Sequence, residues 1–268
     1  MKPKITAVVQ TYNAERHLDA VLKSLAVFDE IVIVDMESTD STPEIARRHG
    51  ARFIVVPKKS YTVCEAYRDF AVHQASHEWV LVVDADELIP PALARFLYAE
   101  VERDDSPRGY CIARKNYFMG RWMRSSYPDY VLRFFKKEGS YWPPTVHSKV
   151  SHQGPVVTIP AKRTDLAMLH LANENPRQMI AKMNLYTDDE IVRRSKSYAP
   201  WRVFVDPPFR FFKTYVLKGG FRDGMPGFIH AVHDAIYRFY ILAKIQQQRA
   251  DSKANKDIDR DVENSSEQ

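Results

Sequence analysis

Four short runs of apolar residues divide the first third of the chain. They occupy residues 5–9, 31–34, 53–56 and 79–83, and most of their side chains are β-branched or leucine. Apolar runs of this length are typical of strands buried on both faces of a parallel sheet. Between the first two runs, apolar residues recur at helical spacing, at Leu18, Val21, Leu22 and Leu25. This alternation predicts an α/β fold with a mostly parallel sheet and right-handed crossovers.

Polar residues follow three of these predicted strands. They are Thr11-Tyr12-Asn13, Asp35 with Ser38-Thr39-Asp40, and Asp84-Ala85-Asp86. The carboxyl ends of neighbouring parallel strands lie side by side, so these groups could hold a base, a ribose and a metal-bound diphosphate in one line. Carboxylate oxygens suit a hard cation such as Mg²⁺. The alternative for the third group is an acidic loop ahead of a helix that Pro90-Pro91 begins.

The phosphate-binding loops of the common nucleotide enzymes are absent from the sequence. No G-x-G-x-x-G and no G-x-x-x-x-G-K-[ST] pattern occurs. This argues against a dinucleotide-dependent dehydrogenase and against a P-loop enzyme. A bound metal would therefore have to take the role of a glycine-rich backbone.

Composition places the chain among globular proteins. Of the 268 residues, 45% are hydrophobic and 27% charged, which predicts one domain with an appendage. The net charge of +5 favours an anionic partner. Cys64 and Cys111 lie in apolar-periodic segments and are predicted to be reduced core thiols rather than a disulfide or metal pair. No secretory hydrophobic region and no membrane-spanning segment are expected.

The last third combines aromatic residues with bases. Residues 193–249 hold eleven Lys and Arg against three Asp, whereas 250–268 hold six acids against three bases. We expect a catalytic domain at 1–180, with a donor half to about 105, a basic helical region at 181–249 and a disordered acidic tail at 250–268. The helical region could lie on anionic lipid, or its aromatic side could pack on the catalytic domain. No nucleic-acid-binding motif is present, so we expect no nucleic-acid partner.

Several of these motifs, in this order, resemble glycosyltransferase family 2 with the GT-A fold. The resemblance is closest to the lipopolysaccharide core β-1,4-glucosyltransferase-like branch and covers roughly residues 3 to 246. The segments that carry it are Thr11-Tyr12-Asn13 with Glu15, Val34-Asp35 through Ser38-Thr39-Asp40-Ser41-Thr42, Asp84-Ala85-Asp86-Glu87, residues 114–122, Tyr127-Pro128-Asp129, Leu132-Arg133-Phe134-Phe135, Val146-His147 and residues 219–224.

The resemblance implies a role for each matching residue. Thr11, Tyr12 and Glu15 would lie around the nucleotide, Asp35 would accept a hydrogen bond from the base, and Arg68 would contact the base or the diphosphate. Asp84 would touch ribose or sugar hydroxyls. Asp86 would bind Mg²⁺ or Mn²⁺, and His147 would complete the metal site or hydrogen-bond the diphosphate. Asp129 would deprotonate the attacking hydroxyl, and Lys115, Arg121 and Arg133 are cations available to the leaving diphosphate.

Three of these roles have a structural alternative. Arg68 could be a helix-surface arginine, Asp129 an acid in the turn after Pro128, and His147 a structural histidine. The relatives are expected to have His-Glu where this chain has His147-Ser148, so Glu87 could replace the missing acid. His170 is a weaker candidate ligand.

The function that follows is an inverting, metal-dependent hexosyl transfer. The donor would be a nucleotide sugar, a UDP-sugar by preference, and the acceptor an oligosaccharide or lipid-linked saccharide of the bacterial cell envelope, such as lipopolysaccharide core. Such an enzyme would be cytoplasmic, with an anionic inner membrane surface as a further partner. The rival functions are a sugar nucleotidyltransferase and a non-catalytic nucleotide-sugar-binding or scaffold protein.

Overall fold

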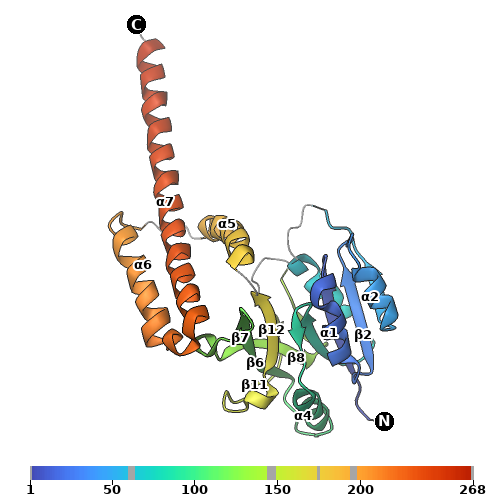
Figure 1. The fold of residues 1–268 in the computed structure, drawn as a ribbon. Helices are drawn as coiled ribbons and strands as arrows, with labels where there is room; N and C mark the ends of the chain where they lie inside the picture. The colour runs from blue at the N-terminus through green and yellow to red at the C-terminus, as the bar shows by residue number, and fades with distance from the viewer. Residues whose placement is uncertain (1, 60–63, 144–148, 174–175, 194–197, 267–268) are drawn as a thin grey trace. The chain divides into compact units, whose positions relative to one another are not determined.

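A computed structural model describes residues 2–59, 64–143, 149–173, 176–193 and 198–266 (Figure 1). The chain forms two compact units. The first, which we call the sheet unit, comprises Met1–Tyr117 and Tyr127–Ala172, and the second, the helical unit, comprises Phe118–Ser126 and Asn173–Gln268. The division falls after residue 172 rather than at the expected residue 180, and residues 118–126 belong with the C-terminal residues, which was not expected.

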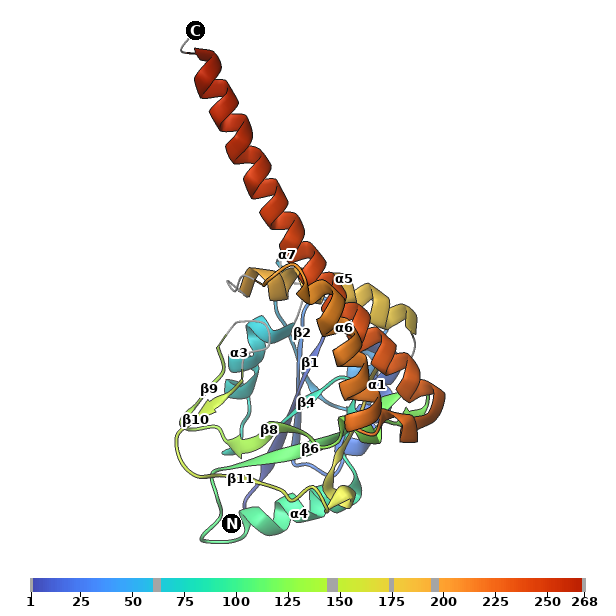
Figure 2. The same ribbon diagram turned by 90° about the vertical axis from the view of Figure 1, so that its left-hand side faces the viewer.

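The four predicted strands form the parallel half of the sheet unit (Figure 2). They are β1 (Ile5–Thr11), β2 (Glu30–Asp35), β3 (Arg52–Val55) and β4 (Trp79–Asp84). They lie in the order β3-β2-β1-β4 and pair in parallel. The helices between them are α1 (Glu15–Leu25), α2 (Thr42–Arg48) and α3 (Arg68–His73), the last preceded by a 3-10 turn at Cys64–Tyr67.

The sheet continues beyond β4 with antiparallel pairing. The order of the path is β4-β8-β6-β12-β5, and β11 lies parallel to β6. The bounds are β5 (Glu87–Leu88), α4 (Pro91–Val101), β6 (Gly109–Phe118), β8 (Asp129–Lys136), β11 (Val156–Thr158) and β12 (Met168–Asn173), with β9 (Ser140–Tyr141) and β10 (Ser151–His152) as a separate pair. Because β8 lies antiparallel to β4, the first residues of β8 are brought toward the carboxyl end of β4.

Side-chain alternation along the strands gives the sheet two apolar faces. Ala7, Val9, Leu81 and Val83 pack with α1, α2 and α4 on one face, while Val8, Val80 and Val82 pack with α3 on the other. Strands buried on both faces cannot carry solvent-facing polar residues along their length. The polar residues therefore collect at the strand ends, where the candidate site lies.

The helical unit is built around its longest helix. Its elements are β7 (Arg121–Trp122), a 3-10 turn at Arg124–Ser126, α5 (Pro176–Arg193), α6 (Arg202–Phe212) with a π-helical extension at Lys213–Leu217, a 3-10 turn at Gly220–Asp223, and α7 (Gly224–Ser266). Residues 118–126 belong here because the buried Asp223 carboxylate accepts hydrogen bonds from Arg124 N and Ser125 N, each at 3.0 Å. Phe118 and Met123 also pack against Met179.

The C-terminal tail differs from the disordered segment that its composition suggested. Helix α7 continues through it to Ser266 (Figure 1). The segment contains no glycine or proline after Gly227, and Gln247 Nε2 donates to Asp251 Oδ1 one turn on, at 2.7 Å. Among the described residues, no helix is apolar enough over a sufficient length to cross a bilayer.

Candidate active site

Asp84, the last residue of β4, lies between two arginines of the sheet unit. Its Oδ1 accepts from Arg68 Nη2 at 3.2 Å, and its Oδ2 pairs with Arg133 Nη2 on β8. The Arg68 guanidinium also lies over the ring of Trp142, 4.8 Å from its centroid, and its side chain is only 15% exposed. Arg68 is therefore not a helix-surface arginine, and the alternative interpretation of that residue is wrong.

Glu87 holds the same arginine from the other side. The side chain is fully buried, and its Oε1 accepts from Arg133 Nη2 and Arg114 Nη1, each at 3.1 Å. Its Oε2 accepts from Asp84 N at 2.9 Å, which fixes the turn after β4. Glu87 thus holds the arginines in place and presents no surface to a substrate.

Burial and charge oppose each other in this cluster. Burial by itself would raise the pKa of Asp84, but the guanidinium groups of Arg133, Arg68 and Arg114 outweigh it and hold that pKa well below its usual range. Burial would likewise lower the pKa of Arg133, and the carboxylates of Asp84 and Glu87 raise it instead. Asp84 and Arg133 are therefore ionised at neutral pH.

Asp129 begins β8 and is held through one oxygen. Its Oδ2 accepts from Arg114 Nη2 at 2.6 Å, Arg114 Nε at 3.0 Å and Asn116 Nδ2 at 3.1 Å. The side chain is 34% exposed. Among the described residues no donor reaches Oδ1, so this oxygen can accept from a bound molecule. Asp129 thus has one oxygen fixed by protein donors and the other available to a ligand, an arrangement that a general base would need.

Asn116 fixes His170 through its amide oxygen. Its Nδ2 donates to Asp129, so its Oδ1 accepts, and His170 Nδ1 lies 2.6 Å from that oxygen. Nδ1 therefore carries the proton in neutral His170, and Nε2 presents a lone pair. This Nε2 lies 3.7 Å from Asp86 Oδ1. Two electron-pair donors that face each other at this distance suit a shared cation.

These side chains form one continuous chain of contacts, which we call the site network. Its members are Arg68, Asp84, Arg133, Glu87, Arg114, Asp129, Asn116, His170 and Asp86. No group of three His, Cys, Asp or Glu side chains with metal-binding geometry occurs among the described residues. Asp86 and His170 nevertheless fit Mg²⁺ or Mn²⁺ with further ligands from a substrate diphosphate. His147 lies outside the described residues.

The remaining predicted nucleotide residues lie around the first two strand ends. The buried Asp35 accepts from Thr11 Oγ1 at 2.6 Å and from Ser38 Oγ at 2.6 Å. Lys58 Nζ donates to Tyr12 Oη at 2.6 Å. In this state Asp35 organises the loop after β2, with its carboxylate already bonded to protein donors.

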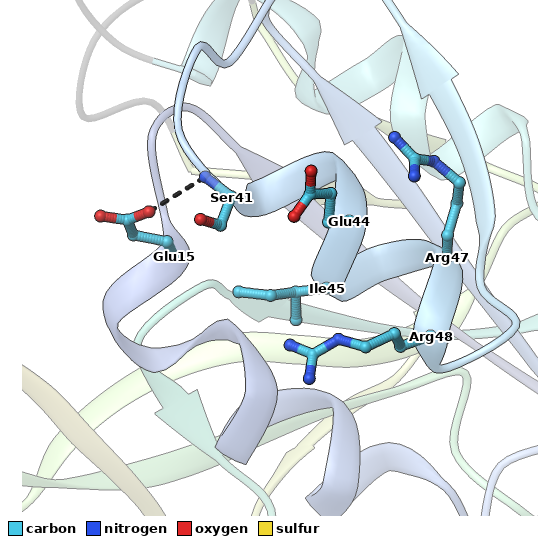
Figure 3. A pocket seen from close by; sticks show the side chains of 6 residues that line it. All are labelled: Glu15, Ser41, Glu44, Ile45, Arg47 and Arg48. Atoms are coloured by element: carbon cyan, nitrogen blue, oxygen red, sulfur yellow. Dashed lines mark hydrogen bonds between the residues drawn. The ribbon is translucent and has the colours of Figure 1, made fainter.

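Glu15 lines a surface pocket at the start of α1 (Figure 3). Its Oε2 accepts from Ser41 N at 3.0 Å, and Glu44, Ile45, Arg47 and Arg48 complete the lining. None of Asp84, Asp86 and Asp129 contributes to this pocket. The pocket that Glu15 lines therefore does not include these acids of the site network.

Gln10 is a residue that sequence reasoning missed. It lies next to last on β1, opposite Asp84 on β4, and is 7% exposed. Neither its amide nitrogen nor its oxygen has a hydrogen-bond partner among the described residues. Such groups are rare, because each costs about 1–3 kcal/mol. A polar residue at an inward-facing strand position was the available signal.

Comparison with known proteins identifies relatives of this chain. The model of glycosyl transferase family 2 matches residues 6–154. The lipopolysaccharide core biosynthesis glycosyltransferase LpsC of Rhizobium meliloti is 31% identical, over 97% of this chain and 98% of its own. An uncharacterized glycosyltransferase of Rickettsia felis is 28% identical, over 93% and 92%.

Among solved structures, the chain is similar to the mannosyltransferase PcManGT of Pyrobaculum calidifontis, solved with GDP-Man and Mn²⁺. The identity is 18%, the TM-score 0.49, and the match covers 93% of this chain and 76% of the other. The family match covers more than half of the chain, and the parallel sheet with acids at its carboxyl edge agrees with the GT-A fold. This protein belongs to glycosyl transferase family 2 and is a glycosyltransferase.

Proposed function

We propose that this enzyme transfers a hexose from a UDP-sugar, with inversion, to a hydroxyl of a bacterial envelope saccharide. Membership of the family supports the reaction class. The similarity to the lipopolysaccharide core biosynthesis glycosyltransferase of Rhizobium meliloti supports an acceptor of the lipopolysaccharide core type. The observation that carries the proposal is the clamping of Asp129 through Oδ2 alone, which leaves Oδ1 for an acceptor.

Asp129 would act as the general base. The acceptor oxygen would attack the anomeric carbon of the donor while the hydroxyl proton passes to Asp129 Oδ1. The bond from the anomeric carbon to the diphosphate oxygen would break on the opposite side of that carbon. A sugar hydroxyl is a weak nucleophile at neutral pH, so a positioned carboxylate contributes about 10²–10⁴-fold. Arg114 and Asn116 hold the carboxylate in orientation during this transfer.

The arginines of the site network have little charge to spare for a diphosphate. Arg68, Arg114 and Arg133 are opposed by Asp84, Glu87 and Asp129. A divalent cation would supply the missing positive charge on the leaving group when bound. Asp86 and His170 are the residues we propose to hold Mg²⁺ or Mn²⁺, and the protonated Nδ1 of His170 sets the orientation of that ring.

Donor recognition is assigned to the strand ends. Thr11, Tyr12, Glu15 and Asp35 would surround the base and ribose, and Arg68 and Asp84 would lie nearer the diphosphate and sugar. Gln10 adds a buried amide beside Asp84 that has no hydrogen-bond partner within the described part of the chain. A lipid-linked acceptor would further place the enzyme at the cytoplasmic face of the membrane.

Release of UDP from a panel of UDP-sugars tests the proposal. Wild-type protein is incubated with core oligosaccharide acceptors and with Mg²⁺, Mn²⁺ or EDTA, and the anomeric configuration of the product is read by NMR. Turnover of one donor that requires metal and inverts the anomeric centre is the expected result. Donor binding without turnover would instead favour a binding or scaffold protein, and no binding of any UDP-sugar would overturn the proposal.

A further inference from the structure

Helix α6 of the helical unit packs its polar side inward. Asp206 Oδ2 accepts from Arg238 Nη2 of α7 at 2.6 Å, and Arg210 Nε lies 3.0 Å from Asp234 Oδ2. Thr214 Oγ1, on the π-helical extension, donates to the same Asp234 oxygen at 2.6 Å. Helices α6 and α7 lie side by side (Figures 1 and 2). These ion pairs and hydrogen bonds, together with ring contacts of Phe211 and Tyr215 with Phe228, hold them together.

The opposite side of α6 and its extension carries large apolar side chains. We call it the α6 face. Its members, with their exposed fractions, are Phe204 (79%), Leu217 (64%), Trp201 (61%), Phe209 (59%), Val205 (52%) and Phe212 (48%). A helix of a globular protein normally buries its apolar stripe. Contiguous exposed apolar surface of this kind marks an interaction site.

Exposed bases flank this face, and acids are missing from it. Lys213 and Lys218 are exposed, whereas Arg210 pairs with Asp234 of α7 on the inner side. Between residues 198 and 233 the acids are Asp206, which pairs with Arg202 and Arg238, and Asp223, which is fully buried. A cationic rim around aromatic and aliphatic side chains complements a surface that is anionic at its boundary and apolar beneath.

We propose that the α6 face inserts into the headgroup region of an anionic lipid bilayer. The inference rests on the membrane-side location in the proposed function and deepens it by naming the surface and its ligand. Trp201 and the phenylalanines enter to the level of the acyl boundary, and the lysines reach lipid phosphates. A second copy of the chain is disfavoured as the occupant, because Lys213 and Lys218 of the two copies would bring like charges together across such a contact.

Flotation with vesicles tests the proposal independently of catalysis. Full-length protein is mixed with vesicles of phosphatidylcholine alone, or of equal parts phosphatidylethanolamine and phosphatidylglycerol. We expect binding to the second kind only, weakening as salt rises. Phe204→Ser with Phe209→Ser should weaken it about tenfold or more, and Lys213→Glu with Lys218→Glu by about fivefold per lysine. Phe70→Ser, an exposed phenylalanine of the sheet unit, should bind as wild type.

A second readout follows the inserted side chain itself. Trp201 emission should shift to shorter wavelength on vesicle addition, and Trp201→Phe should abolish that shift. UDP release with a soluble acceptor is measured in parallel and should stay unchanged in every variant. Failure of the proposed reaction would appear in this assay, whereas failure of the membrane proposal would appear in the vesicle assays. Absence of wild-type binding to anionic vesicles at low salt would overturn the proposal. The proposal would also be overturned if the Phe204, Phe209 double variant bound vesicles as strongly as the wild type. The same holds if the wild type were a dimer and the double variant a monomer.

Discussion

The site network of the sheet unit and helix α6 of the helical unit both contain arginine–aspartate pairs, but the pairs serve different ends. In the network, Glu87 and Arg133 are almost completely buried, and each carboxylate fixes the position of the next arginine. Asp206 of α6 pairs with Arg238 of α7, and Asp234 of α7 pairs with Arg210 of α6, which leaves the outer side of α6 apolar. The buried pairs of the network therefore fix the positions of site residues, whereas the partly exposed pairs of α6 fix which side of that helix faces α7.

Asp129→Asn should give the largest effect on activity. We expect kcat to fall by about 10²–10⁴-fold with the donor KM little changed, because the amide keeps the shape but cannot accept the proton. UDP release under saturating donor measures it. Asp105→Asn, which alters an exposed aspartate paired with Arg103, serves as the matched control and should retain wild-type kcat. Near-normal turnover by Asp129→Asn would remove Asp129 from the base role.

Glu87→Gln should give the largest loss of stability. Removal of this charge leaves Arg114 and Arg133 short of a carboxylate in a buried position, which costs about 3–5 kcal/mol. Urea unfolding followed by circular dichroism gives the free energy. Glu138→Gln changes a carboxylate that is 85% exposed and pairs with Arg108, so its cost should stay within about 1 kcal/mol. Equal losses in both variants would contradict the importance of burial.

His170→Gln should weaken metal activation. With one proposed ligand replaced, the Mn²⁺ concentration that gives half-maximal UDP release should rise by about 10–100-fold. A titration of activity against free Mn²⁺ measures this, and excess metal should restore much of kcat. His73→Gln, an exposed histidine of the same unit, is the control. An unchanged metal requirement in His170→Gln would exclude this residue as a ligand.

Asp206 should make the helical unit sensitive to acid. Burial would raise its pKa, but hydrogen bonds from Arg238 and Arg202 outweigh this and lower it. A lowered folded-state pKa contributes stability above the unfolded-state pKa of about 3.9, and this contribution is lost as the pH falls below that value. Thermal unfolding at pH 7 and pH 3 should therefore show a smaller acid-dependent loss in Asp206→Asn than in wild type. Asp188→Asn, at a 60% exposed aspartate, should behave as wild type.

Phe204→Ser should give the smallest effect on stability in solution. The side chain is 79% exposed, so its loss should change the free energy of unfolding by no more than about 0.5 kcal/mol. Phe135→Ser, at a fully buried position of the sheet unit, should cost about 3–5 kcal/mol in the same denaturant titration. A large loss in Phe204→Ser would mean that the α6 face supports the fold rather than a partner.

The parallel half of the fold could be predicted because its signal is local. Apolar runs and helical spacing predicted β1, β2, β3 and β4 in order. The polar groups that follow these strands indicated that the site lies at the carboxyl ends of the parallel strands. Asp84 and Asp86 could be singled out in this way, and motif order pointed to the family.

The rest depended on contacts between distant segments. Arg114 and Asn116 come from β6, Asp129 and Arg133 from β8, and His170 from β12, so only the antiparallel pairing brings them to Asp86 and Glu87. Periodicity does not report which side of α6 packs inward. An amphipathic helix has the same sequence pattern whether its apolar or its polar side faces the rest of the protein. The continuation of α7 to Ser266 was missed because composition alone measures apolar content and not helix propensity.

The continuity of the site network has a consequence for how this site can change over generations. Arg68, Arg114 and Arg133 alternate with Asp84, Glu87 and Asp129 in equal number, so a single replacement leaves a surplus charge on its neighbours. Variants that preserve function should therefore arise as compensating pairs. The effect of replacing Arg114 should depend strongly on which residue stands at position 87, so these positions would drift together rather than independently.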